Sequence, residues 1–124
     1  MTKILIVDDE YDIVDLLDDF LTQHGYETGR AHSKKETLEA LAHSTPDIVL
    51  LDIKLPDGLG LDILRDIKKA TPKVEVIMIT GLSDKQIALE SIRRGAADYI
   101  TKPIDLNYLL SSVLSRVIFG YGSD

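Results

Sequence analysis

Four short apolar runs in this chain each end at a polar residue. Residues 4–7 are followed by Asp8 and Asp9, residues 48–51 by Asp52, residues 76–79 by Thr80, and residues 99–101 by Lys102. Short, continuously apolar runs with helix-length segments between them are typical of buried parallel strands. Ligands of an open α/β sheet bind beyond the carboxyl ends of its strands. The pattern therefore predicts that carboxylates, a hydroxyl and an ammonium group meet at one edge of one sheet.

The segments between these runs complete five successive pairs of strand and helix. The expected strands are residues 3–7, 27–31, 48–51, 74–79 and 97–101, and the expected helices begin near residues 10, 33, 61, 84 and 105. Residues 55–60 have the composition of a loop. Five such pairs predict an α/β fold with a doubly wound, parallel five-stranded sheet and right-handed crossovers. A flavodoxin-like strand order, 2-1-3-4-5, places Asp8, Asp9 and Asp52 side by side.

Local signals define the ends and the buried faces of the helices. Helix-ending glycines are expected at Gly25 and Gly95, a capping box at Ser33 and Glu36, and N-caps at Asp84 and Asp105. Apolar residues at helical spacing are expected to face the core. They are Ile13, Leu16, Leu17, Phe20 and Leu21, then Leu38 and Leu41, then Leu61, Leu64 and Ile67, and finally Leu109, Leu110, Val113, Leu114 and Val117.

Charge and composition restrict the partners of the chain. Its 124 residues are 44% hydrophobic, and we expect residues 1–119 to form one domain and residues 120–124 a tail. The net charge of −7 argues against direct binding of nucleic acid or of an anionic membrane. There is no cysteine for a disulfide or a metal site, no stretch of transmembrane length, and no signal-peptide pattern. These features favour a cytoplasmic domain.

The predicted group of carboxylates requires a positively charged partner. Two carboxylates ~4 Å apart, at an effective dielectric constant of about 20, repel each other by on the order of 4 kcal/mol. Oxygen ligands without His or Cys favour a hard cation, and positions open to water and phosphate suit Mg²⁺, with Mn²⁺ as the alternative. Lys102 and Thr80 would bind phosphoryl oxygens. Asp52, which ends the most buried strand, is then the candidate nucleophile for an aspartyl-phosphate.

With these residues, the chain resembles the receiver domain of two-component response regulators over nearly its full length. The matching motifs are Val7-Asp8-Asp9-Glu10, Leu51-Asp52-Ile53-Lys54-Leu55-Pro56 with Gly60, Ile79-Thr80-Gly81, and Tyr99-Ile100-Thr101-Lys102-Pro103. Each motif alone is weakly specific, but together they are highly specific. The departure from the family is Leu55, where methionine is commoner, and this is a near-isosteric apolar exchange.

The resemblance implies roles for these residues. Asp52 would accept a phosphoryl group from a sensor histidine kinase or a phosphotransfer protein. Asp8, Asp9, Asp52 and the backbone carbonyl of Lys54 would hold the metal, and the Lys102–Pro103 peptide bond would be cis. Such a domain is not an enzyme beyond Mg²⁺-dependent self-phosphorylation and slow autodephosphorylation.

The resemblance also implies a conformational switch. Thr80 would move toward the phosphoryl group, and the Tyr99 ring would turn into the space that Thr80 leaves. This would reshape the face made by the fourth helix, fifth strand and fifth helix, which would contact an output partner or a fused effector domain, as a monomer or a phosphorylation-dependent homodimer. We further hypothesise that the side chains of Lys54 and Leu82 control how water reaches the phosphoryl group.

Simpler interpretations exist for single residues. Asp8 and Asp9 would serve as helix caps, Asp52 as a turn former, Thr80 as the end of a strand, Lys54 and Lys102 as solvated lysines, and Tyr99 as strand packing. The combination of these residues at strand ends favours the site. Three histidines, His24, His32 and His43, are expected at the surface without a metal or phosphotransfer role.

Other functions explain the sequence less well. A phosphatase of the haloacid-dehalogenase type carries Asp-x-Asp after its first strand, whereas Asp52 is followed by Ile53 and Lys54 after the third. A flavodoxin-like cofactor binder needs a phosphate loop rich in glycine and hydroxyl groups after the first strand, where residues 8–10 are acidic. A receiver domain excised from a larger transcriptional regulator or hybrid kinase is a further alternative.

Overall fold

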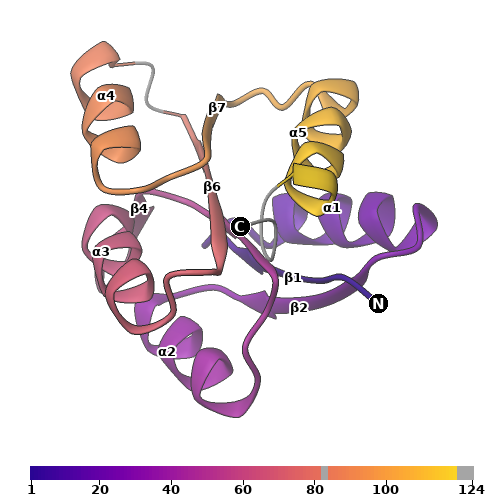
Figure 1. The fold of residues 1–124 in the computed structure, drawn as a ribbon, viewed down its shortest axis with the longest axis horizontal. Helices are drawn as coiled ribbons and strands as arrows, with labels where there is room; N and C mark the ends of the chain where they lie inside the picture. The colour runs from indigo at the N-terminus through magenta and orange to yellow at the C-terminus, as the bar shows by residue number, and fades with distance from the viewer. Residues whose placement is uncertain (82–83, 120–124) are drawn as a thin grey trace.

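The computed structural model describes residues 1–81 and 84–119, which form a parallel sheet between two layers of helices (Figure 1). The sheet has the order β2-β1-β3-β6-β7, and all four of its strand pairs are parallel. Its strands are β1 (Lys3–Val7), β2 (Glu27–Ala31), β3 (Ile48–Leu51), β6 (Glu75–Thr80) and β7 (Asp98–Thr101). The helices are α1 (Tyr11–Gln23), α2 (Lys34–His43), α3 (Gly60–Ala70), α4 (Lys85–Arg93) and α5 (Leu106–Phe119). Because β6 and β7 are the fourth and fifth strands of this sheet along the chain, its order is the predicted 2-1-3-4-5. The fold is the predicted doubly wound α/β fold.

Two hydrophobic cores lie on the two faces of the sheet. One core joins α1 and α5 to the sheet through Val14, Leu17, Leu109 and Val113. The other core joins α3 to the opposite face, with α2 and α4 packed against it (Figure 1). The central strand β3 is buried along its whole length, as its apolar sequence predicts. The sheet is therefore covered on both faces, and its carboxyl edge is where polar side chains can gather.

The predicted helix ends are confirmed, with one difference in the capping of α2. Gly25 and Gly95 follow α1 and α4 with φ of 88° and 103°, a conformation that glycine adopts without a Cβ clash. The Ser33 hydroxyl accepts the N–H of Glu36 at 3.0 Å. The Glu36 carboxylate, however, accepts the N–H of His32 at 2.9 Å, so the second half of the predicted capping box is made one residue earlier. Asp84 and Asp105 also accept backbone N–H groups in the first turns of α4 and α5.

The predicted buried faces were too wide at three positions. Leu16, Leu38 and Leu114 are exposed by 47%, 44% and 48%. Successive residues of an α-helix are turned by about 100° around its axis, so the residue directly before a buried Leu17 points away from the sheet. Val14 is fully buried on α1 instead. The sheet thus contacts a narrower stripe of each helix than hydrophobicity alone indicates.

The segment predicted as a loop after β3 contains a short antiparallel hairpin. Its strands are β4 (Lys54–Leu55) and β5 (Gly58–Leu59), with Pro56 and Asp57 at the turn. The prediction missed it because each strand has only two residues, too few to show a period. Residues 120–124, predicted as a tail, lie outside the described residues. Within the described ranges, no helix combines the length and the apolar character that crossing a membrane requires.

Candidate functional site

The backbone of the sheet brings the predicted site residues to one edge. The N–H of Asp8 donates to the Ala31 carbonyl at 3.1 Å, and the N–H of Asp52 donates to the Val7 carbonyl at 3.0 Å. These bonds continue the strand pairing by one residue beyond β1 and β3. On the other side of β3, the N–H of Lys102 donates to the Thr80 carbonyl at 2.8 Å. Because Leu51 of β3 pairs with Met78 of β6, the carboxyl ends of all five strands lie at one edge of the sheet.

The Lys102 ammonium group lies among three carboxylates. Its Nζ is 2.7 Å from Asp8 Oδ2, 2.8 Å from Glu10 Oε1 and 3.6 Å from Asp52 Oδ2. The side chains of Asp8 and Asp52 are only 3% and 7% exposed. Burial alone would lower the pKa of Lys102, but its bonds to Asp8 and Glu10 outweigh burial and raise the pKa above its usual value. Lys102 therefore carries a fixed positive charge at this edge.

Asp52 is a carboxylate largely withdrawn from water. Burial raises its pKa, and the nearby charge of Asp8 raises it further. Lys102, the N–H of Lys54 and the hydroxyl of Thr80 oppose this rise by stabilising the anion. A buried carboxylate beside another negative charge is stabilised by a nearby cation or by a modification that disperses its charge. This environment agrees with the sequence-based prediction that Asp52 is the reactive position of the group.

The acidic side chains fit a hard divalent cation. Carboxylate oxygens of Asp8, Asp9 and Glu10 lie within 4.8 Å of one another, with Asp8 buried and the other two exposed. With Asp52 they contribute four negative charges at the edge, against the single positive charge of Lys102. All the donors are oxygen atoms, which Mg²⁺ prefers. Both the charge and the donor chemistry therefore match the cation predicted from the sequence.

The same edge is hollowed into an open cavity of about 280 Å³. It is lined by Asp9, Glu10, Asp52, Lys54, Thr80, Gly81 and Lys102. The predicted phosphoacceptor, hydroxyl and ammonium thus share one small polar space, which has room for a phosphoryl group. The predicted tuning residue Lys54 is exposed at this cavity. Leu82, the second predicted tuning residue, lies outside the described residues.

Tyr99 lies beside this group, on the face of the sheet that α4 covers. It is half-buried on β7, opposite Met78 of β6, and it packs against the same core as Ile87 of α4. Burial raises the pKa of its hydroxyl, as do the charges of Asp84 and Asp52. Tyr99 therefore shares a core with α4 and lies within the electrostatic influence of Asp52.

Gly60 supports the main chain of Asp52. Its N–H donates to the Ile53 carbonyl at 2.6 Å. A Cβ at this position would overlap with the backbone carbonyl oxygen of Asp52. The glycine of the sequence motif thus allows α3 to begin directly against the segment that carries the predicted phosphoacceptor.

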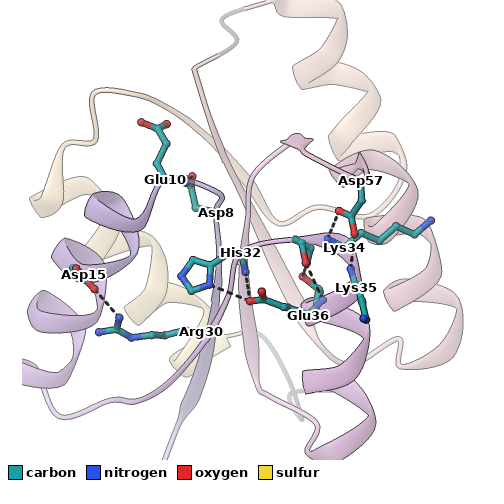
Figure 2. A network of polar contacts seen from close by, with 11 residues as sticks. Asp8, Glu10, Asp15, Arg30, His32, Lys34, Lys35, Glu36 and Asp57 are labelled. Atoms are coloured by element: carbon teal, nitrogen blue, oxygen red, sulfur yellow. Dashed lines mark hydrogen bonds and ion pairs between the residues drawn. The ribbon is translucent and has the colours of Figure 1, made fainter.

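Some contacts were not predicted from the sequence. The sequence predicts no separate role for Glu10, yet Glu10 contacts Lys102 directly. Its position directly after two aspartates is the sequence signal that indicates a place in the site. The prediction that His32 is a plain surface residue was wrong. Its ring stacks on Tyr11 at 3.8 Å between centroids, and its Nε2 is buried without a hydrogen-bond partner. Its Nδ1 is 3.0 Å from Glu36 Oε1 (Figure 2). The Lys102–Pro103 bond is cis, as the resemblance implied.

Comparisons with known proteins agree with this geometry. A family model described as the response regulator receiver domain matches residues 4–114. The response regulator protein PilR of Pseudomonas aeruginosa is 42% identical over 115 residues, which are 93% of this chain and 26% of PilR. The sporulation initiation phosphotransferase F of Bacillus subtilis is 35% identical over 111 residues, which are 90% of each chain. This chain thus spans about a quarter of PilR and nearly all of the Bacillus protein.

A solved structure shows the same fold. The response regulator receiver domain protein (CheY-like) from Methanospirillum hungatei JF-1 superposes with a TM-score of 0.91 at 33% identity. The match covers 95% of this chain and 94% of that one. The arrangement of strands that brings the site residues together is therefore shared with a known receiver domain.

Proposed function

Because the chain belongs to the response regulator receiver domain family, we propose that Asp52 accepts a phosphoryl group from a histidine kinase or a phosphotransfer protein. Receiver domains are the phosphoacceptors of two-component systems rather than classical enzymes. The observation that carries the assignment to Asp52 is the convergence of one buried carboxylate, one ammonium and one hydroxyl on a single cavity. The donor, the output partner and any effector domain belong to the same proposal.

The chemistry follows from the placement of Asp52. An oxygen of its carboxylate forms a bond to phosphorus while the bond between phosphorus and the donor imidazole breaks. The electron pair of that bond stays on the imidazole nitrogen, and the product is an aspartyl-phosphate. Lys102 and Thr80 lie where they can bind phosphoryl oxygens and stabilise the charge that develops there. Slow attack of water on the same phosphorus would return the carboxylate and release phosphate.

Asp8, Asp9, Asp52 and the backbone carbonyl of Lys54 would hold the divalent cation, with Glu10 close by. When bound, Mg²⁺ or Mn²⁺ neutralises charge on the carboxylates and on the transferred group. The residues of the chain supply the other contributions: Lys102 carries a fixed positive charge, and the side chains that line the open cavity would orient the phosphoryl group. The exposed Lys54 side chain is placed to affect the entry of water.

The proposed output surface is the face of α4, β7 and α5. Phosphorylation adds negative charge and acceptor oxygens at Asp52. These would engage Thr80, and the Tyr99 ring would turn inward into the space that Thr80 leaves. Several large apolar side chains on these helices are exposed by about half, among them Leu89 by 56%, Ile92 by 49% and Tyr108 by 50%. Such residues support a partner or a second copy of the chain on this face.

A phosphorylation assay with a matched variant tests the proposal. The protein is incubated with acetyl phosphate and MgCl₂, and intact-mass spectrometry should show one added phosphoryl group. Asp52→Asn should remove the addition. Asp47→Asn is the control, because Asp47 precedes the same strand at its opposite end and its carboxylate accepts the backbone N–H of Lys3, away from the cavity. If Asp52→Asn is modified as fully as the parent, the assignment is wrong.

The same sample separates the proposal from a phosphatase. Steady hydrolysis of p-nitrophenyl phosphate over many turnovers would favour the haloacid-dehalogenase alternative. A single modification followed by slow release of phosphate would agree with a phosphoacceptor. Repeating the reaction with EDTA tests the metal, since the modification should then be lost.

A further inference from the structure

Asp57 caps a helix that lies far from it in the sequence. Its Oδ1 accepts the N–H of Lys34 at 2.7 Å, and its Oδ2 accepts the N–H of Lys35 at 2.9 Å (Figure 2). These are the first two residues of α2, whose N–H groups have no partner inside the helix. The two bonds lower the pKa of Asp57, and the positive end of the helix dipole favours its anion. The capping box of Ser33 satisfies the next N–H, so Asp57 completes the start of α2.

The tip of the β4–β5 hairpin and the start of α2 are in close contact. Gly58 follows Asp57 at the turn, and a Cβ on Gly58 would lie 2.8 Å from Cδ of Lys34. The aliphatic stem of Lys34 therefore lies directly over the hairpin. The tip is held by two hydrogen bonds and by packing, although Asp57 itself is exposed.

The base of the same hairpin forms part of the proposed site. The N–H of Lys54 lies near the Asp52 carboxylate and lowers its pKa, and the N–H of Gly60 closes the hairpin on the Ile53 carbonyl at 2.6 Å. Each strand has only two residues between base and tip. A displacement of the tip is therefore transmitted to the main chain of Lys54 with little room to be absorbed.

We propose that Asp57 is a positioning residue for the phosphoacceptor site. By fixing the hairpin tip on α2, it holds in place the main chain of Lys54, whose N–H lies near Asp52 and whose carbonyl would help to hold the divalent cation. This inference rests on the proposed function, because it concerns how the same site is kept in shape. It assigns a role to a residue that contacts neither the phosphoryl group nor the cation.

The test measures binding of Mg²⁺ alone, by calorimetry, to the parent and to Asp57→Ala, Asp57→Asn and Ser33→Ala. Outer residues that orient metal ligands typically change affinity by 10- to 100-fold; since Asp57 acts through the backbone, we expect about three- to tenfold weaker binding for Asp57→Ala. Asn keeps one acceptor, so Asp57→Asn should lose less. Ser33→Ala is the matched control, because it removes a cap from α2 and leaves the hairpin anchored.

Two further readouts distinguish positioning from a general loss of stability. Amide hydrogen exchange at Lys54 should be faster in Asp57→Ala than in Ser33→Ala. Phosphorylation by acetyl phosphate should require more Mg²⁺ for half the maximal rate in Asp57→Ala, while the rate at saturating Mg²⁺ returns toward that of the parent. Circular dichroism establishes that each variant is folded, and Asp57→Asn decides the matter if the alanine variant is not.

The outcomes separate the two proposals. If the parent binds Mg²⁺ and is phosphorylated while Asp57→Ala matches it in affinity and in Lys54 exchange, the role of Asp57 is refuted and the proposed function stands. An equal loss in Ser33→Ala also refutes it, because loosening α2 would then be sufficient. If the parent neither binds Mg²⁺ nor accepts a phosphoryl group, the proposed function fails, and this inference fails with it.

Discussion

Replacing Lys102 by methionine removes the cation on which the site depends when no metal is bound. At an effective dielectric constant of about 20, Lys102 is attracted to Asp8 at 2.7 Å by ~6 kcal/mol and to Asp52 at 3.6 Å by ~5 kcal/mol. Much of this attraction offsets the cost of burying the charges. Removing one partner of a buried ion pair typically costs 3–5 kcal/mol. Because the ammonium is still 15% exposed, we expect Lys102→Met to lower the free energy of unfolding by about 3 kcal/mol at pH 7 in EDTA.

The loss should depend on pH in a defined direction. The pKa of Asp52 is already raised, and without Lys102 it rises further because one of the groups that lower it is gone. A carboxyl group whose pKa is raised in the folded state lowers the free energy of unfolding at pH values above its folded-state pKa. This destabilisation disappears once the pH falls below its unfolded-state pKa. The difference between parent and variant should therefore shrink as the pH is lowered from 7 toward 4.

Urea unfolding followed by circular dichroism measures both effects, with and without MgCl₂. A cation at 100 times its dissociation constant adds ~2.7 kcal/mol to the folded state. Mg²⁺ should stabilise the variant more than the parent, because its site has one more uncompensated negative charge. Lys73→Met, at an exposed loop position, should change stability by less than about 0.5 kcal/mol. Equal stability of Lys102→Met and the parent in EDTA, or equal stabilisation of both by Mg²⁺, would refute the reasoning.

Three further predictions concern one support of the site and two polar contacts elsewhere in the fold. Gly60→Ala should destabilise the fold by about 3 kcal/mol or more in urea unfolding, because its Cβ would meet a backbone carbonyl, whereas Gly81→Ala, with nothing within 4 Å, should change little. The pKa of Tyr108 is raised by its hydrogen bond to Asp98, so an absorbance titration should show this pKa falling in Asp98→Asn; an unchanged titration would contradict the bond. The pKa of Asp18 in the folded state is lowered by its bonds from β2. Its carboxylate therefore stabilises the fold at pH values above its unfolded-state pKa, and this stabilisation is lost as the pH falls through its folded-state pKa. In Asp18→Asn, the free energy of unfolding should therefore fall less steeply as the pH is lowered.

The order of strands could be predicted from the sequence, and the edge that carries the site followed from it. In a parallel sheet every strand ends at the same edge, so a polar residue directly after a buried strand has a known location. Asp8, Asp52, Thr80 and Lys102 were placed correctly on this basis alone. The helix-ending glycines and most caps were also predictable, since these depend on a few neighbouring residues.

Contacts between distant segments could not be predicted in the same way. The ion pair of Glu10 with Lys102 joins residues 92 positions apart, and Asp57 reaches α2 across 23 positions. The stacking of His32 on Tyr11 likewise depends on how α1 and β2 are placed in space. In each of these contacts, the distance between the two side chains is set only when the helices and strands pack together.

The sequence by itself determined which kinds of residue stand at the ends of the strands, because hydrophobic runs and local signals are properties of adjacent positions. Only the tertiary structure decided how those residues pair. The choice of Asp8 and Glu10 as the nearest partners of Lys102, the exposure of Leu16, and the anchoring of the hairpin by Asp57 all depend on distances between packed elements. Those distances arise from the way the helices pack on the sheet, and no local sequence pattern specifies that packing.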